Sequence, residues 1–245
     1  MSDSGALLFA RYAYPPNELG YCGPSGASAL LRSDLPGEIA RRARGFEGAW
    51  AYLEYLSRAS GDPLDPVAVS AYWVGDSLPV ESDFSDLLPY LRARFAGQLG
   101  GTWESAAGRA IPHHSFHVFE VYPWAALLRR TGNPTAVSVL DRCRIRTGKV
   151  VAVRGETARV TSRPLVWDGS TLSAGAPCEE EVAWSAGGRS LLDGLSPGDR
   201  VALHWDWVCD VITPEQASRI ESLEERQRRA LFPEKCHTPG LASAP

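Results

Sequence analysis

The sequence lacks several features that would assign it to a well-defined class of protein. No apolar run approaches the roughly 20 residues that a membrane-spanning helix needs, and Met1-Ser2-Asp3-Ser4 is unlike the basic start of a signal peptide. No phosphate-binding loop of the form G-x-x-x-x-G-K-S/T or G-x-G-x-x-G occurs, which argues against a nucleotide-driven role. We therefore expect a cytoplasmic protein with no membrane partner.

The chain also has no excess of positive charge and no paired cysteines. Its 25 Lys and Arg face 29 Asp and Glu, for a formal net charge of −4, so a nucleic-acid partner is not expected. The five cysteines are dispersed without a C-x-x-C pair, which in a cytoplasmic protein indicates free thiols. We expect Cys209 in the core, and Cys178 and Cys236 at the surface.

A change of pattern near residue 140 predicts two domains in an α+β fold. Residues 1–140 carry apolar side chains at helical spacing, for example between Ala43 and Leu56, and are predicted to be mostly helical. Residues 141–232 carry β-rich runs and a final helix, which predicts a small OB-like β-barrel followed by a C-terminal helix. Residues 233–245 are rich in Pro, Gly, Ala and Ser and are predicted to form a flexible tail.

The second domain has clear local signals. Arg154-Gly155-Glu156 has the composition of a tight hairpin turn between two strands. Residues 200–212 alternate around His204 and predict one strand with this histidine opposite Leu203 and Trp205. Thr213 followed by Pro214 predicts a capped helix that runs to about Leu231.

This half contains a cysteine before a short strand, and a Gly-Asp before a histidine-containing strand with an acidic helix after it: Cys143, Gly148, Lys149, Val150, Gly198, Asp199, His204 and residues 213–221. The order of these elements resembles the HypC/HupF family of NiFe hydrogenase assembly chaperones. The match departs from the family because Cys143 is internal rather than next to the initiator methionine. It also departs at an insertion-like segment, residues 167–175.

The resemblance implies a barrel in which Cys143 and His204 hold an Fe(CN)2(CO) group transiently. A thiolate is a soft ligand that suits such iron, and an imidazole can ligate or donate a hydrogen bond. The implied partners are the NiFe hydrogenase large subunit precursor and an iron-group assembly protein of the HypD type. Arg144 and Arg146, next to the cysteine, are either partners for cyanide or an acidic surface, or solvated charges. An assembly chaperone without catalytic turnover is expected.

A second group of candidate ligands lies in the first domain. Three histidines, His113, His114 and His117, fall within residues 111–124. In a helix, His113 and His117 would share a face and could bind zinc or iron with Glu120 as a further ligand. In a strand, His113 and His117 would share a face opposite His114. The alternative is a polar patch beside an aromatic core.

Cys22, between Gly20 and Gly23, is a candidate second thiol near the histidine group. The first domain also looks like an uncharacterised actinobacterial family associated with NiFe hydrogenases. The leading hypothesis is therefore a hydrogenase maturation chaperone. The rival is a metalloenzyme or metal-binding protein that uses the histidine group, with the barrel as a partner-binding module.

Overall fold

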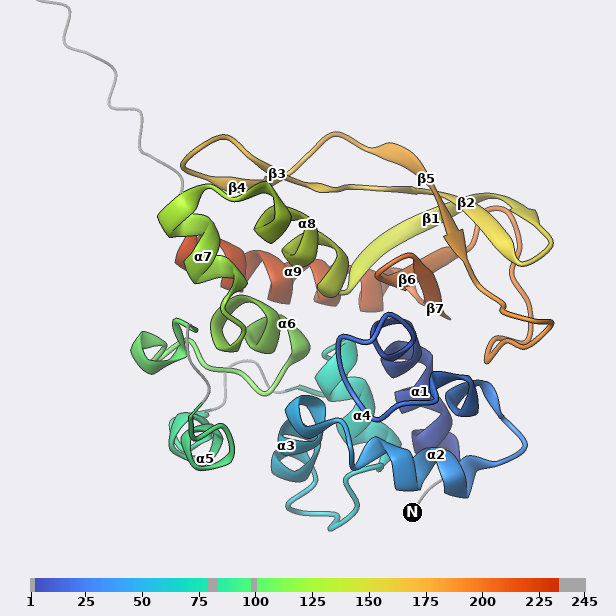
Figure 1. The fold of residues 1–245 in the computed structure, drawn as a ribbon, viewed down its shortest axis with the longest axis horizontal. Coiled ribbons are helices and arrows are strands. Elements are labelled where there is room, and N and C mark those ends of the chain that lie inside the picture. The colour runs from blue at the N-terminus through green and yellow to red at the C-terminus, as the bar shows by residue number, and fades with distance from the viewer. Residues whose placement is uncertain (1–2, 79–82, 98–100, 234–245) are drawn as a thin grey trace, which may run out of the picture.

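The computed structural model describes residues 3–78, 83–97 and 101–233, and it confirms the predicted α+β fold. Helices make up the first half of the chain, and a closed β-barrel with a long C-terminal helix makes up the second half (Figure 1). Within the described residues, no helix is long and apolar enough to cross a membrane. The predicted tail lies outside the described residues, apart from Pro233, and so does Cys236.

The helical half is built mostly from short helices. Its elements are α1 (Asp3–Glu18), η1 (Ala27–Leu31), α2 (Pro36–Ala43), α3 (Glu47–Leu56), α4 (Pro66–Trp73), α5 (Leu87–Arg94), η2 (Trp103–Ser105), α6 (His114–Phe116), η3 (His117–Val121), α7 (Trp124–Thr131) and α8 (Pro134–Cys143). Proline stands in the first turn of α2, α4 and α8, where its missing N–H costs no hydrogen bond. Gly132, in the left-handed conformation, ends α7.

The second half forms a closed five-stranded barrel with one inserted hairpin. The elements are β1 (Arg146–Arg154), β2 (Thr157–Ser162), β3 (Leu165–Trp167), β4 (Leu172–Ala174), β5 (Cys178–Ala183), β6 (Arg200–His204), β7 (Trp207–Val211) and α9 (Pro214–Leu231). The barrel order is β1-β2-β5-β7-β6, and β6 pairs with β1 to close it. The insertion-like segment of the sequence is the separate β3–β4 hairpin.

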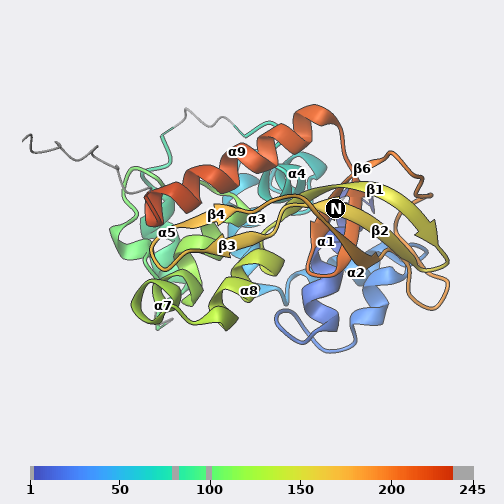
Figure 2. The ribbon, with the colours of Figure 1, turned by 90° about the horizontal axis from the view of Figure 1, so that it is seen from above.

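Two local predictions for this half are confirmed. Gly155, with a positive φ of 56°, lies in the turn between β1 and β2. Helix α9 begins at Pro214 under a capping box in which Thr213 and Gln216 exchange hydrogen bonds, and it ends at Leu231. Seen from above in Figure 2, α9 runs along one side of the molecule beside β4 and towards β1.

Two other predictions are wrong in ways that affect the site. Residues 200–212 are not one strand but a hairpin, in which β6 and β7 are joined at Trp205 and Asp206. Cys143 does not open the barrel, because it is the last residue of α8 and β1 begins three residues later. The cysteine is thus held at a helix end.

One hydrophobic cluster contains side chains from both halves of the chain. Buried side chains from α1 and α4, including Tyr12 and Trp73, belong to the same apolar cluster as Ile145, Trp207 and Ile220. A smaller cluster fills the barrel itself, and a third joins α7 and α8 to the β3–β4 hairpin and α9. Position 140, where two domains were predicted to meet, lies inside α8.

Candidate metal centre

Three buried side chains from distant parts of the sequence meet between the helical half and the barrel. The candidate ligand atoms of His114, Cys143 and His204 all lie within 4.8 Å of one another. The side chains come from α6, the end of α8 and the end of β6. The two candidate sites of the sequence, the Cys143–His204 pair and the histidine group, therefore meet in one place through His114.

The hairpin turn between β6 and β7 brings two of these side chains together. The backbone N–H of Trp205 donates to the carbonyl of Arg142 at 2.6 Å, and the Arg142 guanidinium pairs with Asp206. Trp205 takes a positive φ of 54°, which is uncommon for a bulky residue. The turn is thus docked on the last turn of α8, so that His204 lies beside Cys143.

His204 is in the tautomer that a metal ligand requires. Its Nδ1 lies 2.8 Å from the carbonyl oxygen of Tyr12, and since a carbonyl only accepts, Nδ1 carries the proton and donates it. The Nε2 atom is then a bare lone pair, and it is buried without a partner among the described residues. Metal-binding histidines commonly donate their second ring N–H to a backbone carbonyl in this way.

His114 is fixed by the same type of contact. Its Nε2 donates to the carbonyl oxygen of Cys143 at 2.8 Å, which leaves Nδ1 as the acceptor. The Tyr72 hydroxyl lies 3.2 Å from this Nδ1 and 2.9 Å from Nδ1 of His117. While the single Tyr72 proton is directed to His114, it occupies the Nδ1 lone pair of His114, and Tyr72 accepts from His117. His114 Nδ1 becomes free to bind a metal when this proton turns to His117 Nδ1, so Tyr72 and His117 control the His114 donor.

Burial keeps all three groups uncharged when no metal is bound. It lowers the pKa of His114 to about 4, and it lowers the pKa of His204 well below the ordinary value for histidine. Burial raises the pKa of the Cys143 thiol far above its usual range. The group therefore presents two neutral imidazoles and one protonated thiol, and metal binding would release the thiol proton.

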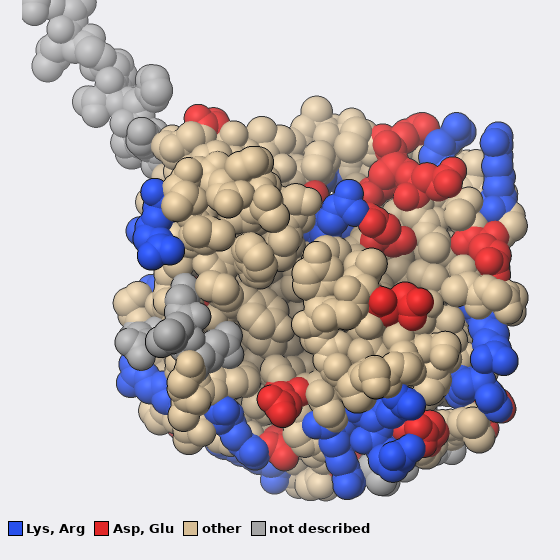
Figure 3. Space-filling model, in the orientation of Figure 1, with Lys and Arg blue, Asp and Glu red and all other residues tan. Residues whose placement is uncertain are grey.

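A cavity of about 610 Å³ opens onto this group. Six aromatic side chains line it: Tyr21, Phe46, Tyr72, Trp73, Tyr122 and Trp124. Among the described lining residues, Glu47 alone carries a formal charge. Charged side chains also lie mostly towards the edges of the face shown in Figure 3, and its centre is largely uncharged. A ligand in this cavity would meet aromatic surface and the three donor atoms.

Two glycines shape the walls of this cavity. A Cβ on Gly48 would overlap the ring of His117, and a Cβ on Gly23 would overlap the ring of Phe46. Cys22, the last candidate ligand of the sequence, also lines the cavity and is half-buried. Burial raises the pKa of its thiol to about 12.

The histidine motif is helical, but His113 and His117 are not the pair that faces the cavity. His113 caps α6, and its Nδ1 contacts the N–H and hydroxyl of Ser115. His114 and His117 line the cavity instead. Glu120 is also directed elsewhere, since it is fully buried in an ion pair with Arg109. The short π-helix η3 changes the residue spacing after His117, which an ideal helix does not predict.

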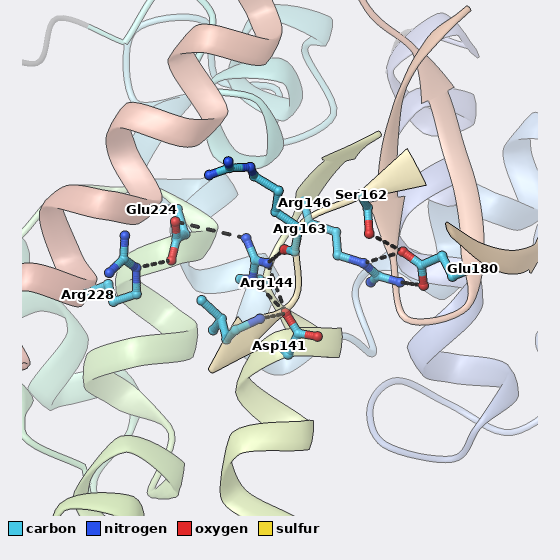
Figure 4. A network of polar contacts seen from close by, with 9 residues as sticks. Asp141, Arg144, Arg146, Ser162, Arg163, Glu180, Glu224 and Arg228 are labelled. Atoms are coloured by element: carbon cyan, nitrogen blue, oxygen red, sulfur yellow. Dashed lines mark hydrogen bonds and ion pairs between the residues drawn. The ribbon is translucent and has the colours of Figure 1, made fainter. Parts of the chain in front are cut away.

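Arg144 and Arg146 are neither solvated nor directed at the cavity. Arg144 pairs with Asp141 at 2.9 Å and donates to the carbonyl oxygen of Arg163 at 2.6 Å. Arg146 pairs with Glu180 at 2.7 Å (Figure 4). Glu224 of α9 lies 4.0 Å from Arg144 and extends the network to a second helix. These buried pairs fix the chain immediately after Cys143, and so they fix the position of its thiol.

Sequence reasoning missed the aromatic neighbours of the site. Tyr72 and Trp73 lie at the end of α4, where their pattern is that of a buried helix. Tyr72 joins two histidines by hydrogen bonds, and the Trp73 ring centroid lies 4.6 Å from that of His114. No spacing in the sequence links residue 72 with residues 114 or 204, so only the tertiary fold reveals these contacts.

Comparison with known proteins places this chain in a family without an assigned activity. A family model described as a family of unknown function, DUF6390, matches residues 1–233, so the chain belongs to this family. The match runs through both halves of the fold and includes all three side chains of the candidate centre. Neither curated proteins nor solved structures give a match.

Proposed function

We propose that this protein binds a transition metal ion, or a small iron complex, through His114, Cys143 and His204 and delivers it to a partner. One observation carries the proposal: donor atoms from three distant segments lie within 4.8 Å of one another, and His204 Nε2 has no hydrogen-bond partner in the part of the chain that the structure describes. A buried nitrogen lone pair without a partner is costly unless a ligand satisfies it. Imidazole and thiolate together suit zinc, copper or iron.

The number of protein ligands favours a carrier over a purely structural site. Structural zinc sites normally have four protein ligands, whereas three leave a coordination position open. Here the open position would face the cavity of about 610 Å³. Cargo that must be released is better held by such a site than by a closed cage.

The proposed cargo and partners come from the HypC/HupF resemblance. Cys143 and His204, which that resemblance selects, would hold an Fe(CN)2(CO) group as cargo. The partners would be the NiFe hydrogenase large subunit precursor and an assembly protein of the HypD type, and the protein would act in the cytoplasm without turnover of its own. The adjacency of Cys143 and His204 supports this assignment, because residues 61 positions apart in the sequence need not meet.

The test is to purify tagged protein from a host that expresses a NiFe hydrogenase and to record its infrared spectrum. Wild type should carry a hydrogenase subunit or assembly protein together with cyanide and carbonyl bands. Cys143→Ala should lose the bands, while the matched variant Cys178→Ala, at an exposed strand position, should keep them. Wild type without partner and without bands would contradict the hydrogenase assignment.

A second candidate function is a metalloenzyme, favoured by the size of the aromatic cavity beside the three donors. A carrier of one metal group needs little space, whereas a cavity of about 610 Å³ can hold an organic substrate. In that case the protein should contain stoichiometric zinc or iron when purified from a host without a NiFe hydrogenase. His117 would act as a positioning residue through Tyr72.

A further inference from the structure

The Tyr72 hydroxyl contacts two histidines but has one proton to donate. Its oxygen lies 3.2 Å from Nδ1 of His114 and 2.9 Å from Nδ1 of His117. Tyr72 is fully buried, so within the described part of the chain these two nitrogens are the acceptors for its proton. Without metal this proton is directed to His114, and His117 donates from Nδ1 to the Tyr72 oxygen. His117 Nε2 is then a bare acceptor, because a neutral imidazole carries one proton.

A metal ion on His114 reverses this arrangement. The metal takes the Nδ1 lone pair of His114, and the Tyr72 proton must turn to Nδ1 of His117, since a buried hydroxyl without an acceptor is costly. His117 must then carry its own proton on Nε2. The ring loses one proton to solvent from Nδ1 and takes one up at Nε2, so its charge does not change. Metal binding thus converts His117 Nε2 from an acceptor into a donor.

The His117 ring lies against the start of helix α3, at the wall of the cavity. His117 is 3% exposed and lines the cavity, and its Nε2 makes no hydrogen bond to any residue that the structure describes. A Cβ on Gly48 would lie 3.0 Å from this nitrogen. Gly48 belongs to the first turn of α3, so the new donor would stand beside the N-terminus of a helix.

The first turn of α3 supplies further donors to the same cavity. Its N-cap residue, Phe46, makes no side-chain hydrogen bond. The N–H groups of Glu47, Gly48 and Ala49 have no acceptor among the described residues, and all three residues line the cavity. Free N–H groups and the positive end of the helix dipole favour an anion. The charge that opposes an anion here is the Glu47 carboxylate, whose residue is exposed.

We propose that a metal ion on His114 creates an anion subsite, in which His117 Nε2 and the first turn of α3 hold the free end of a small anion. The other end of this anion would occupy the open coordination position of the metal. The inference rests on the proposed metal centre and specifies its added ligand: a small anion with a hydrogen-bond acceptor at its outer end. Tyr72 is the positioning residue that couples the two binding events.

The first test is the tautomer of His117, read from long-range ¹H–¹⁵N spectra of the full-length protein with and without Zn²⁺. The proton should be on Nδ1 without metal and on Nε2 with Zn²⁺. In Tyr72→Phe, Zn²⁺ should leave the tautomer unchanged. The matched control Tyr52→Phe removes a buried hydroxyl that has no partner and lies beside the same ring, and it should behave as wild type. One tautomer in both states of the wild type would overturn the coupling.

The second test is azide binding to the Co²⁺-loaded protein, followed by visible absorption. Wild type should bind azide about tenfold or more tightly than His117→Phe, which lacks the N–H donor to the anion. Tyr72→Phe should bind Co²⁺ itself roughly 2- to 10-fold more tightly than wild type and Tyr52→Phe, because its His114 Nδ1 is already free.

The outcomes separate the subsite from the metal centre. Equal azide affinity in wild type and His117→Phe would overturn the subsite and leave the three-ligand centre standing. Weaker Co²⁺ binding by Tyr72→Phe than by Tyr52→Phe would overturn the role of Tyr72. Wild type that binds neither Zn²⁺ nor Co²⁺ would overturn the metal centre, and the subsite with it.

Discussion

Lowering the pH should destabilise this protein strongly, because its buried histidines must remain neutral in the folded state. Burial lowers the pKa of His113 and of His117 to about 3 and that of His114 to about 4. In the unfolded chain a histidine titrates near its ordinary pKa of about 6.5. Between these values the unfolded state binds more protons than the folded state, so stability is complete above pH 6.5 and is lost as the pH falls towards 4.

The size of the effect follows from the same values. Going from pH 7 to pH 5 should cost about 2 kcal/mol for each of these three histidines, or about 6 kcal/mol together. His204, whose pKa is lowered as well, acts in the same direction. A loss of this size is comparable to the whole stability of a typical domain, about 5–15 kcal/mol.

The assay is urea unfolding of the metal-free protein at pH 7 and pH 5, with His117→Phe as the matched variant. Phenylalanine can occupy the aromatic site beside Tyr52, Phe95 and Tyr122, but it takes up no proton. The variant should therefore lose about 2 kcal/mol less than wild type over this pH range. Equal free energies of unfolding for wild type at the two pH values would refute the burial of neutral histidines.

Three further predictions concern single positions. Glu180→Gln should lower the free energy of unfolding by about 3–5 kcal/mol, because it leaves the buried Arg146 unpaired. The control Glu179→Gln breaks an exposed pair and should lower it by about 0–1 kcal/mol. Equal losses for the two variants in urea unfolding would contradict the role of the Arg146–Glu180 pair. Gly48→Ala should lower the melting temperature because its Cβ overlaps His117, whereas Gly37→Ala, at the same position of α2 but in open space, should not; calorimetry of both variants decides. Zn²⁺ affinity, measured by competition with a chelator, should rise at least about tenfold per pH unit near neutrality. The reason is that the pKa of Cys143 is raised, so its thiol must release a proton when Zn²⁺ binds. An affinity that does not change with pH would exclude Cys143 as a ligand.

The sequence predicts those turns and helix ends that are determined by residues next to them in the chain. The β1–β2 turn at Gly155 and the capping box of α9 depend on neighbouring residues, and both are found as predicted. The turn at Trp205 and Asp206 has no glycine or asparagine to mark it, and the alternation of residues 200–212 continues through it. Its positive φ is supported by tertiary contacts with α8, which no pattern within the strand reveals.

The sequence identified the three residues of the candidate centre, but it did not predict that they lie together. The resemblance selected Cys143 and His204, and the histidine motif contained His114. Their meeting depends on the docking of the β6–β7 turn on α8 and on the buried ion pairs of Arg144 and Arg146. These contacts join segments far apart in the chain, so the sequence indicated two separate candidate sites, whereas among the described residues His114, Cys143 and His204 form one group.

The most direct test of the proposed centre is X-ray absorption spectroscopy of the Zn²⁺-loaded protein, compared with Cys143→Ser and His204→Gln. Wild type should show nitrogen scatterers at about 2.0–2.1 Å and sulfur at about 2.3 Å. Cys143→Ser should lose sulfur scattering, and His204→Gln should lose imidazole scattering together with affinity. A zinc shell of oxygen and nitrogen atoms alone, unchanged in both variants, would contradict the assignment of His114, Cys143 and His204 as the metal centre.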